Sequence, residues 1–440
     1  MEDAYLIKGG KPLHGTVVLS GAKNIGLKVL IAALMFEGKV ELSNIPRIQD
    51  ILELIELLKQ LGVSVEFGDN NVVSLDSSNL SVNKVDLLYA SKIRASFLLF
   101  APLLYKFGKA VIPNPGGCRI GARSIDRVIE GLKSLGINLQ YDSNTGYYTA
   151  IMNQKPQGSY AFQKSSHTGT ELLIMMSVFG SGKITIENAA QEPEIDDLIG
   201  FLNEGGAKIT RNGKTITVEG VLNLKQQKPY TIASDRVEAF TYAVAGIATQ
   251  GDITISSISE HFITPFLEVL NKTGAGVERL PDNNWRFYYK PIKAVDIETS
   301  PHPGFLTDWQ PLFAVLMSQA SGQSIIHERI FENRFSYVEE LWRLGAKIEY
   351  IHHPVENPVS HYFFNYDQNK TYQQTIQVTG PQNLHGGVLT MADIRAGATL
   401  AVAALVANGE SYLREVQHME RGYEDFEKKI RNLGGEIKRI

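Results

Sequence analysis

The sequence has a single cysteine, Cys118, among its 440 residues. One thiol can form neither an internal disulfide nor a cysteine-cluster metal site, and such usage is typical of proteins in a reducing compartment. Long apolar runs are also missing, since stretches such as 27–36 and 399–407 are too short to cross a bilayer. Residues 1–4 lack the basic and apolar regions of a signal peptide. We therefore expect a cytoplasmic protein that makes no contact with a membrane.

The chain has no large excess of one charge. Lysine and arginine number 43 and aspartate and glutamate 47, which gives a formal net charge of −4. No overall basic field therefore favours binding to nucleic acid. A Walker A motif, a strand–GxGxxG–helix fingerprint and an HExxH spacing are all absent from the sequence. We expect no metal, no organic cofactor and no nucleic-acid partner.

One sequence unit recurs six times along the chain. Each copy has a glycine that ends an amphipathic stretch and a second glycine 23 to 28 residues before it. The later glycines are Gly62, Gly136, Gly206, Gly274, Gly345 and Gly434, and the earlier ones are Gly38, Gly108, Gly182, Gly251, Gly322 and Gly409. Consecutive later glycines are 68 to 74 residues apart, except for the last two, which are 89 apart.

The residues around the two glycines predict the structure of each copy. Between them lie a β-rich run and an amphipathic helix, such as the one predicted over 48–61. Before the earlier glycine lies a helix that is apolar on nearly all sides and should therefore be buried. These buried helices are predicted over 25–36, 96–107, 238–248, 309–320 and 396–407.

The repeat predicts an α/β fold. Each copy has a strand, a buried helix, a strand, an exposed helix and a strand. Three copies would place their buried helices at a shared centre with the sheets outside. Six copies then form two pseudo-threefold domains of βαβαβ-type units, which is a two-domain inside-out α/β barrel. The alternative is an open solenoid, which usually has polar end caps that we do not find in the sequence.

Charged residues stand near the start of the helices that we expect to be buried. They are Lys23, Arg94, Lys164, Asp235, Arg236, Asp308 and Arg395. Helix N-termini attract anions, so a lysine or arginine there opposes the helix dipole unless an anion binds as well. Several such ends together predict a ligand with phosphate or carboxylate groups. The alternative is that these charges pair with one another or cap their helices, and Asp308 is either a helix cap or a general base.

Residues 114–123 form the sharpest local feature. Their sequence is Asn-Pro-Gly-Gly-Cys-Arg-Ile-Gly-Ala-Arg, which is typical of a mobile loop. Cys118 lies there beside Arg119 and near Arg123, and neighbouring cations lower the pKa of a thiol and favour the reactive thiolate. The alternative is an inert, buried cysteine.

Nine motifs of the chain resemble those of the enolpyruvyl transferase family, and the similarity runs essentially from end to end. They are SGAKN at 20–24, IRAS at 93–96, PGGC and IGAR within 115–123, IENAAQEPEI at 186–195, DRVEA at 235–239, PGFLTDWQ at 303–310, FENRF at 331–335, ADIRAGA at 392–398 and RGYE at 421–424. The resemblance implies a first domain over 23–233 that carries the catalytic loop 114–123. It implies a second domain over 1–22 plus 234–440, with the active site in the cleft between the two domains.

The resemblance also implies a reaction. The enolpyruvyl group of phosphoenolpyruvate would pass to the 3′-hydroxyl of UDP-N-acetylglucosamine, with release of phosphate, in the first committed step of peptidoglycan synthesis. The family needs no metal or organic cofactor for this chemistry. We expect a monomer or a weak homo-oligomer whose partners are these two small molecules.

The family's residue roles carry over by position. Cys118 matches the cysteine that adds to phosphoenolpyruvate and donates a proton to its methylene carbon, and Asp308 matches the base that takes the proton of the attacking hydroxyl. Lys23 and Arg395 match catalytic cations that hold the phosphate and carboxylate of phosphoenolpyruvate. The other positions match substrate contacts: Asn24, Arg94, Arg123, Ser124, Ile125, Asp126, Arg127, Lys164, Ser166, His167, Thr168, Ile330 and Arg334.

The chain departs from the family pattern on the side of the acceptor substrate. Residues 164–170 read Lys-Ser-Ser-His-Thr-Gly-Thr, so His167 stands where the family has a small apolar residue. Arg123 is followed by Ser124, where proline is frequent in the family. Two alternatives therefore stay open: the same transfer to another uridine nucleotide, as in nucleoside-antibiotic pathways, or a weakly catalytic paralogue that binds UDP-sugars.

Overall fold

The computed structural model describes residues 3–116 and 125–440. These residues divide into two compact units, which we call unit 1 (residues 3–20 and 234–440) and unit 2 (residues 21–116 and 125–233). The predicted loop residues Cys118, Arg119, Arg123 and Ser124 lie outside the described residues. Within the described ranges, no helix is long and apolar enough to cross a membrane.

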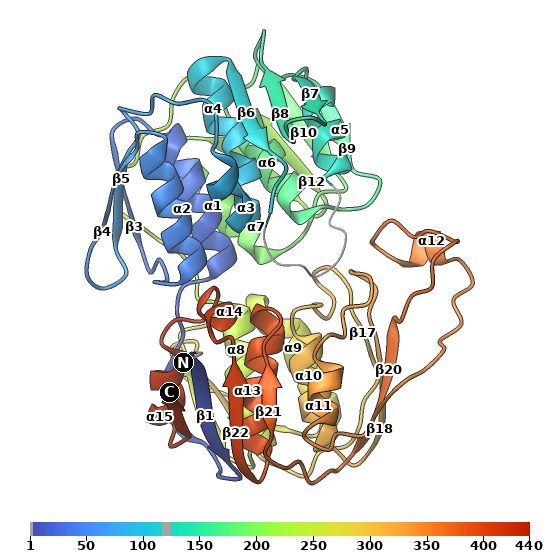
Figure 1. Cartoon of the computed structure of the whole chain (residues 1–440). Helices are drawn as coiled ribbons and strands as arrows, with labels where there is room; N and C mark the ends of the chain where they lie inside the picture. Colours follow the sequence, from blue (N-terminus) through green and yellow to red (C-terminus); the bar gives the residue numbers. More distant parts are fainter. Residues whose placement is uncertain (1–2, 117–124) are drawn as a thin grey trace. The chain divides into compact units, whose positions relative to one another are not determined.

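Each unit has three β-sheets among the described residues (Figure 1). Those of unit 1, in spatial order, are β15(Gly276–Arg279)-β16(Trp285–Tyr288)-β14(Asp252–Ser256)-β2(His14–Val18), β17(Ile297–Glu298)-β18(Gly322–His327)-β20(Thr375–Gly380)-β19(Ile348–Tyr350) and β21(Val388–Thr390)-β22(Gly409–Arg414)-β1(Ala4–Gly9)-β23(Glu436–Arg439). Those of unit 2 are β13(Tyr230–Thr231)-β3(Lys39–Ser43)-β5(Val73–Asp76)-β4(Ser64–Phe67), β6(Lys109–Pro113)-β8(Tyr147–Ile151)-β7(Asn138–Asp142) and β11(Lys208–Asn212)-β12(Thr215–Glu219)-β10(Lys183–Glu187)-β9(Ser159–Ala161).

All six sheets share one topology. In each four-stranded sheet one edge strand runs parallel to its neighbour, and the other pairs are antiparallel. These parallel edge strands are β2, β9, β13, β17 and β21. In the three-stranded sheet, a parallel bridge between Lys84 and Val111 stands in place of the edge strand. A parallel pair needs a long crossover connection. The predicted buried helix lies in that connection between β9 and β10, between β17 and β18, and between β21 and β22, whereas β13 and β3, like β2 and β14, come from distant parts of the sequence. The predicted α/β fold of six similar units is therefore confirmed.

Three apolar helices pack against one another in each unit. In unit 1 they are α8(Arg236–Ala248), α10(Gln310–Ser318) and α13(Ile394–Val406), and every residue of α8 and α10 is buried. In unit 2 they are α1(Lys23–Ala32) with the 3-10 turn η1(Ala33–Met35), η2(Arg94–Leu99) with α4(Phe100–Phe107), and α6(His167–Ser177). Figure 1 shows these helices within each unit, with sheets on their outer sides.

The helix predicted over 96–107 differs from the prediction in its first part. The structure has the 3-10 segment η2 up to Leu99 and an α-helix only from Phe100 onward. Pro102 has no backbone N–H and so cannot donate the i→i−4 hydrogen bond to Leu98 that a continuous α-helix would need. The proline therefore explains why the α-helix starts late.

The amphipathic helices follow the prediction closely. The helix predicted over 48–61 is α2(Gln49–Gln60), and its equivalents are α5(Asp126–Ser134), α7(Pro193–Glu204), α9(Glu260–Thr273), α11(Val338–Trp342) and α15(Phe426–Asn432). The later glycine of every copy has a φ between 85° and 104°, the left-handed region that side chains disfavour. This conformation turns the chain from the helix into the next strand. The remaining helices are α3(Leu87–Lys92), α12(Pro358–His361) and α14(Gln417–Glu420).

The long last interval of the repeat comes from an insertion. The last two strands of each of the first four copies are joined by two to five residues, whereas 351–374 separate β19 from β20. The insertion contains α12 (Figure 1) and packs on the chain that follows β18. Its Phe363 N–H donates to the Arg329 carbonyl at 2.8 Å, and its Gln374 side chain donates to the Glu328 carbonyl at 2.7 Å.

Burial predicts how two leucines of unit 2 contribute to stability. Leu173 on α6 is completely buried, whereas Leu222 after β12 is 91% exposed. We expect Leu173→Ala to lower the free energy of unfolding by about 2–5 kcal/mol because it opens a cavity among the central helices. The control Leu222→Ala should change it by less than about 0.5 kcal/mol. Urea unfolding followed by circular dichroism measures both, and equal losses would show that α6 is not part of the core.

Candidate active site

One carboxylate and two arginines form the centre of the polar network in unit 1. Asp308 precedes α10 and uses both of its oxygens, one for each arginine. Arg334 Nη2 donates to Oδ1 at 2.6 Å, and Arg395 Nε donates to Oδ2 at 3.1 Å. Burial alone would raise the pKa of Asp308, but the charges of Arg395 and Arg334 outweigh it and hold that pKa far below its usual range. Asp308 is therefore a carboxylate whose basicity is suppressed by its partners.

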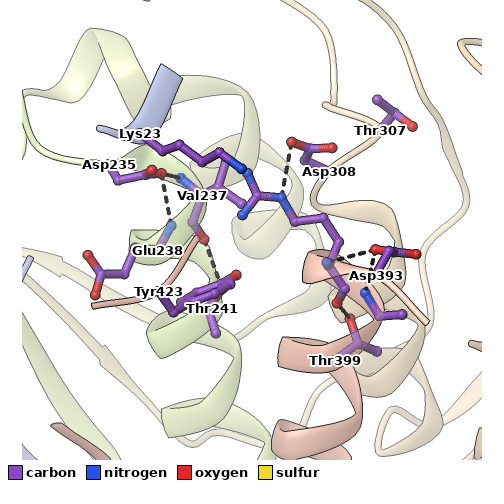
Figure 2. A network of polar contacts seen from close by, with 12 residues as sticks. Lys23, Asp235, Val237, Glu238, Thr241, Thr307, Asp308, Asp393, Thr399 and Tyr423 are labelled. Carbon is purple, nitrogen blue, oxygen red and sulfur yellow. Dashed lines mark hydrogen bonds and ion pairs between the residues drawn. The ribbon is translucent and has the colours of Figure 1, made fainter. Parts of the chain in front are cut away.

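Arg395 is fixed by the start of its own helix. The Asp393 side chain caps α13 by accepting hydrogen bonds from the N–H groups of Arg395 at 2.8 Å and Ala396 at 3.0 Å (Figure 2). The Arg395 guanidinium lies 5.9 Å from the ring centre of Tyr423, whose hydroxyl is 2.8 Å from Thr241 Oγ1 on α8. Burial opposes the charge of Arg395, but Asp308 raises its pKa and keeps it protonated.

Arg334 is held by a second set of contacts. Its Nη1 donates to Thr307 Oγ1 at 2.6 Å, and the Thr307 hydroxyl donates to Glu328 Oε2 at 2.8 Å. The other oxygen of Glu328 accepts the N–H groups of Ile330 at 2.7 Å and Phe331 at 3.1 Å. Glu328 is completely buried. Sequence analysis missed both Thr307 and Glu328, although a glutamate directly after the apolar strand β18 was a signal that something must neutralise it.

The start of α8 completes the group in unit 1. Asp235 caps this helix by accepting the N–H groups of Val237 at 2.7 Å and Glu238 at 3.2 Å. The buried Arg236 reaches the start of α10, where its guanidinium lies 5.8 Å from the centre of the Trp309 ring. The N-termini of α8, α10 and α13 therefore lie together, and the predicted gathering of charged helix ends is found in unit 1.

In unit 2, Lys23 is paired. It is the first residue of α1, and its Nζ lies 2.6 Å from Asp50 Oδ2 in the first turn of α2, with both residues almost completely buried. Asp50 is not one of the helix-start charges, so this pair differs from the alternative that those charges pair with one another or cap their helices. That alternative is found in unit 1, where Asp308 pairs with Arg395 and Asp235 caps α8. Asn24 follows Lys23 and is partly exposed, and Arg94 begins η2 and is also partly exposed.

Two predicted substrate contacts, Arg127 and Lys164, form a second positive region of unit 2. Burial lowers the pKa of Lys164, and the charge of Arg127 lowers it further. Burial also lowers the pKa of Arg127 itself. Ile125 and Asp126 lie beside Arg127, at the start of α5. Two cations that disfavour each other's charge make a region where an anion would be stabilised.

His167, the residue that departs from the family pattern, contacts a buried ion pair; its side chain is 27% exposed, whereas those of Glu171 and Lys28 are buried. His167 Nε2 lies 3.1 Å from Glu171 Oε1 on the same face of α6, and Lys28 Nζ of α1 lies 3.2 Å from that oxygen. Burial acts against the charge of His167, but Glu171 together with Glu192 raises its pKa above the usual value. Ser166 caps the helix by accepting the Gly169 N–H at 3.2 Å, and Thr168 lies in its first turn.

The described residues contain no group of three or more histidine, cysteine, aspartate or glutamate side chains suited to hold a metal ion. Of the seventeen residues predicted for the site, Cys118, Arg123 and Ser124 lie outside the described residues. The structure brings Asp308, Arg334 and Arg395 into direct contact within unit 1.

The chain is similar to known proteins over its whole length. The family described as EPSP synthase (3-phosphoshikimate 1-carboxyvinyltransferase) matches residues 7–430. A UDP-N-acetylglucosamine 1-carboxyvinyltransferase of Idiomarina loihiensis is 38% identical, and one of Bartonella henselae is 39% identical; each match covers 100% of this chain and 99% of the relative.

Two solved structures show the same fold. The enolpyruvyl transferase NikO from Streptomyces tendae has a TM-score of 0.86 at 22% identity, covering 100% of this chain and 99% of that one. An EPSP synthase from Acinetobacter baumannii has a TM-score of 0.74 at 16% identity and covers 100% of both chains.

The buried charges around His167 predict a pH dependence of stability. Because the folded pKa of His167 lies above the unfolded value of about 6.5, the protonated imidazole stabilises the folded chain below that pH, and this contribution is lost as the pH rises through the folded pKa. In this pH window we expect the free energy of unfolding to fall more steeply with rising pH in the wild type than in His167→Gln. The difference between the two slopes should be at most about 1.4 kcal/mol per pH unit. Urea unfolding at several pH values tests this, and identical pH slopes would contradict it. The Lys28–Glu171 pair stays intact in the variant.

Proposed function

The chain belongs to the EPSP synthase family of enolpyruvyl transferases, and on that premise we propose that it is a UDP-N-acetylglucosamine 1-carboxyvinyltransferase. It transfers the enolpyruvyl group of phosphoenolpyruvate to the 3′-hydroxyl of UDP-N-acetylglucosamine and releases phosphate, in peptidoglycan synthesis in the cytoplasm. The observation that carries the proposal is the placement of Asp308 between Arg334 and Arg395 at the N-termini of buried helices. A base beside two buried cations fits a reaction of a hydroxyl with an anionic substrate.

The cations bind phosphoenolpyruvate. We assign its phosphate and carboxylate to Lys23, Arg123 and Arg395. Lys23 stands at the start of α1, which has no side-chain cap and where the helix dipole favours anions, and Arg395 is a cation at the start of α13. Lys23 and Arg395 each contact a carboxylate, Asp50 and Asp308, and Asp308 is shared with Arg334. The substrate therefore replaces existing counter-charges and does not meet bare cations.

The transfer needs a base, an acid and charge stabilisation. Asp308 takes the proton of the 3′-hydroxyl while the hydroxyl oxygen bonds to C2 of phosphoenolpyruvate. Cys118 supplies a proton to C3. The tetrahedral intermediate then loses phosphate from C2 and a proton from C3, which restores the double bond. Fixed cations stabilise the negative charge on the phosphate and carboxylate throughout.

The suppressed basicity of Asp308 links base strength to substrate binding. With both arginines on its oxygens, Asp308 is a weak base. When the anionic substrate takes Arg395, Asp308 keeps only Arg334 and becomes a stronger base. The base is thus active when phosphoenolpyruvate is in place, and an acceptor that binds alone meets a carboxylate that is still held by two arginines.

A second acceptor is favoured by one observation. His167 at the start of α6 carries a charge set by Glu171, next to the predicted contacts Lys164, Ser166 and Thr168. An added cation there suits an acceptor with a terminal phosphate, such as a uridine monophosphate. The second candidate function is therefore the same transfer to a uridine nucleotide without the sugar.

Phosphate release from phosphoenolpyruvate tests the function. We expect release with UDP-N-acetylglucosamine that stops after treatment with fosfomycin, because fosfomycin alkylates the loop cysteine of this family. The variant Cys118→Asp is the control: it should keep turnover, since a carboxylic acid can donate a proton, and should resist fosfomycin. Release with UMP alone would establish the second acceptor, and no release with either acceptor would contradict an enolpyruvyl transferase with these acceptors.

Asp308→Asn tests the base. The amide keeps the size of the side chain but cannot take a proton, so we expect kcat to fall about 10²- to 10⁴-fold. The Kd of UDP-N-acetylglucosamine, measured by calorimetry, should change by less than about threefold, because the lost step is proton transfer. Glu349→Gln, an exposed carboxylate on β19, is the matched control and should leave both values unchanged. Equal losses of kcat and nucleotide affinity would make Asp308 a binding residue only.

A further inference from the structure

Glu328 is completely buried, and within the described residues its side chain is linked to the Asp308 group through Thr307 and Arg334. We propose that Glu328 is a positioning residue for the base. Through Thr307 it fixes the place of Arg334 beside Asp308, so that this arginine stays when Arg395 is given up to the substrate, and it shares the charge of Arg334, so that Asp308 remains an effective base. This inference rests on the proposed function, because it needs a reaction in which Asp308 takes a proton.

The contacts from Glu328 through Thr307 and Arg334 to Asp308, which we call the relay, allow one consistent arrangement of hydrogen atoms. Arg334 can only donate, so Thr307 Oγ1 accepts from Arg334 Nη1 at 2.6 Å. The single hydroxyl hydrogen of Thr307 then points to Glu328 Oε2 at 2.8 Å. Arg334 places its other nitrogen, Nη2, on Asp308 Oδ1 at 2.6 Å. The guanidinium is thus fixed at both ends, by a carboxylate on one side and by a hydroxyl bound to a second carboxylate on the other.

The two arginines on Asp308 are therefore not equivalent. Arg334 is balanced by Asp308 and by Glu328, and the attraction of both carboxylates keeps it charged although burial opposes this. Arg395 donates its Nε to Asp308, and no second carboxylate supports that contact in the way that Glu328 supports Arg334 through Thr307. An anionic substrate consequently displaces Asp308 from Arg395 more easily than from Arg334.

The balance of charge around Arg334 also sets how strongly it holds Asp308. The groups that face this pair in the described chain are Arg395 and Asp393 of α13, Glu328 after β18, and Tyr337 before α11. Burial raises the pKa of Glu328, while the charge of Arg334 and the hydrogen bonds from Thr307, Ile330 and Phe331 oppose that rise. When Glu328 is ionised, the positive charge of Arg334 is shared between two carboxylates. Without that charge, Arg334 would attract Asp308 alone and make it a weaker base.

A merely structural role is the competing explanation, because Glu328 Oε1 also accepts the N–H groups of Ile330 and Phe331. Glu328→Gln separates the two roles. The amide oxygen can still accept both N–H groups, so the turn is kept. The substitution removes the negative charge. The amide nitrogen also faces Thr307 as a donor, so the hydroxyl hydrogen of Thr307 loses its acceptor.

The test is the pH profile of kcat for phosphate release in the wild type and three variants. We expect Glu328→Gln and Thr307→Val each to lower the plateau of kcat about 10- to 100-fold, because each breaks a hydrogen bond to a charged group. The KM values of both substrates should change by less than about threefold. The acid limb of the profile should move to lower pH in Glu328→Gln, since a more strongly held Asp308 protonates at lower pH. Thr307→Ser, which restores the hydroxyl, should recover most of the rate that Thr307→Val loses.

The outcomes separate this role from the alternatives. A rise in the KM of the acceptor with an unmoved pH profile would make Glu328 a support for the turn at Ile330, and wild-type kcat values in both variants would overturn the relay. Melting followed by circular dichroism identifies a variant that fails to fold, and Thr307→Val then carries the test alone. A wild-type protein without turnover overturns the proposed function, whereas a normal wild type with normal variants overturns only the role of Glu328.

Discussion

Charge balance at Asp308 is the constraint on which the chemistry of unit 1 depends. Arg334 and Arg395 are only 7% and 8% exposed, and a buried guanidinium without a counter-charge is strongly unfavourable. Asp308 supplies that counter-charge with one oxygen for each arginine. The same contact holds the pKa of Asp308 far below its usual range, so the base that we propose is weak while both arginines contact it. An anionic substrate that replaces Asp308 on Arg395 both satisfies the arginine and releases the base.

The same principle explains the charges among the apolar helices of unit 2. Lys23 at the start of α1 pairs with Asp50, and Lys28 within α1 pairs with Glu171 of α6, which also contacts His167. Each buried cation thus has a carboxylate from another helix. In this way the central helices can carry charge without a polar face.

The sequence predicts the fold well because its signals are local. Glycines at a fixed offset, apolar helices and amphipathic helices are all read within one copy, and six copies repeat them; only Pro102 changes a helix start. The site is less predictable. Asp308 and Arg395 were predicted as site residues, but their contact joins residues 87 apart in the chain and so is not visible in a local pattern. The link of Glu328 to Arg334 through Thr307 likewise depends on tertiary packing. The insertion 351–374 appears in the sequence only as a longer interval.

The affinity for phosphoenolpyruvate in the absence of an acceptor tests the central claim most directly. If Asp308 competes with the substrate for Arg395, removing the negative charge in Asp308→Asn must free the arginine for the substrate. Calorimetric titration should then show tighter binding of phosphoenolpyruvate to the variant than to the wild type. Weaker or equal binding would mean that Asp308 does not hold Arg395 against the substrate, and it would contradict a base that is released by substrate binding.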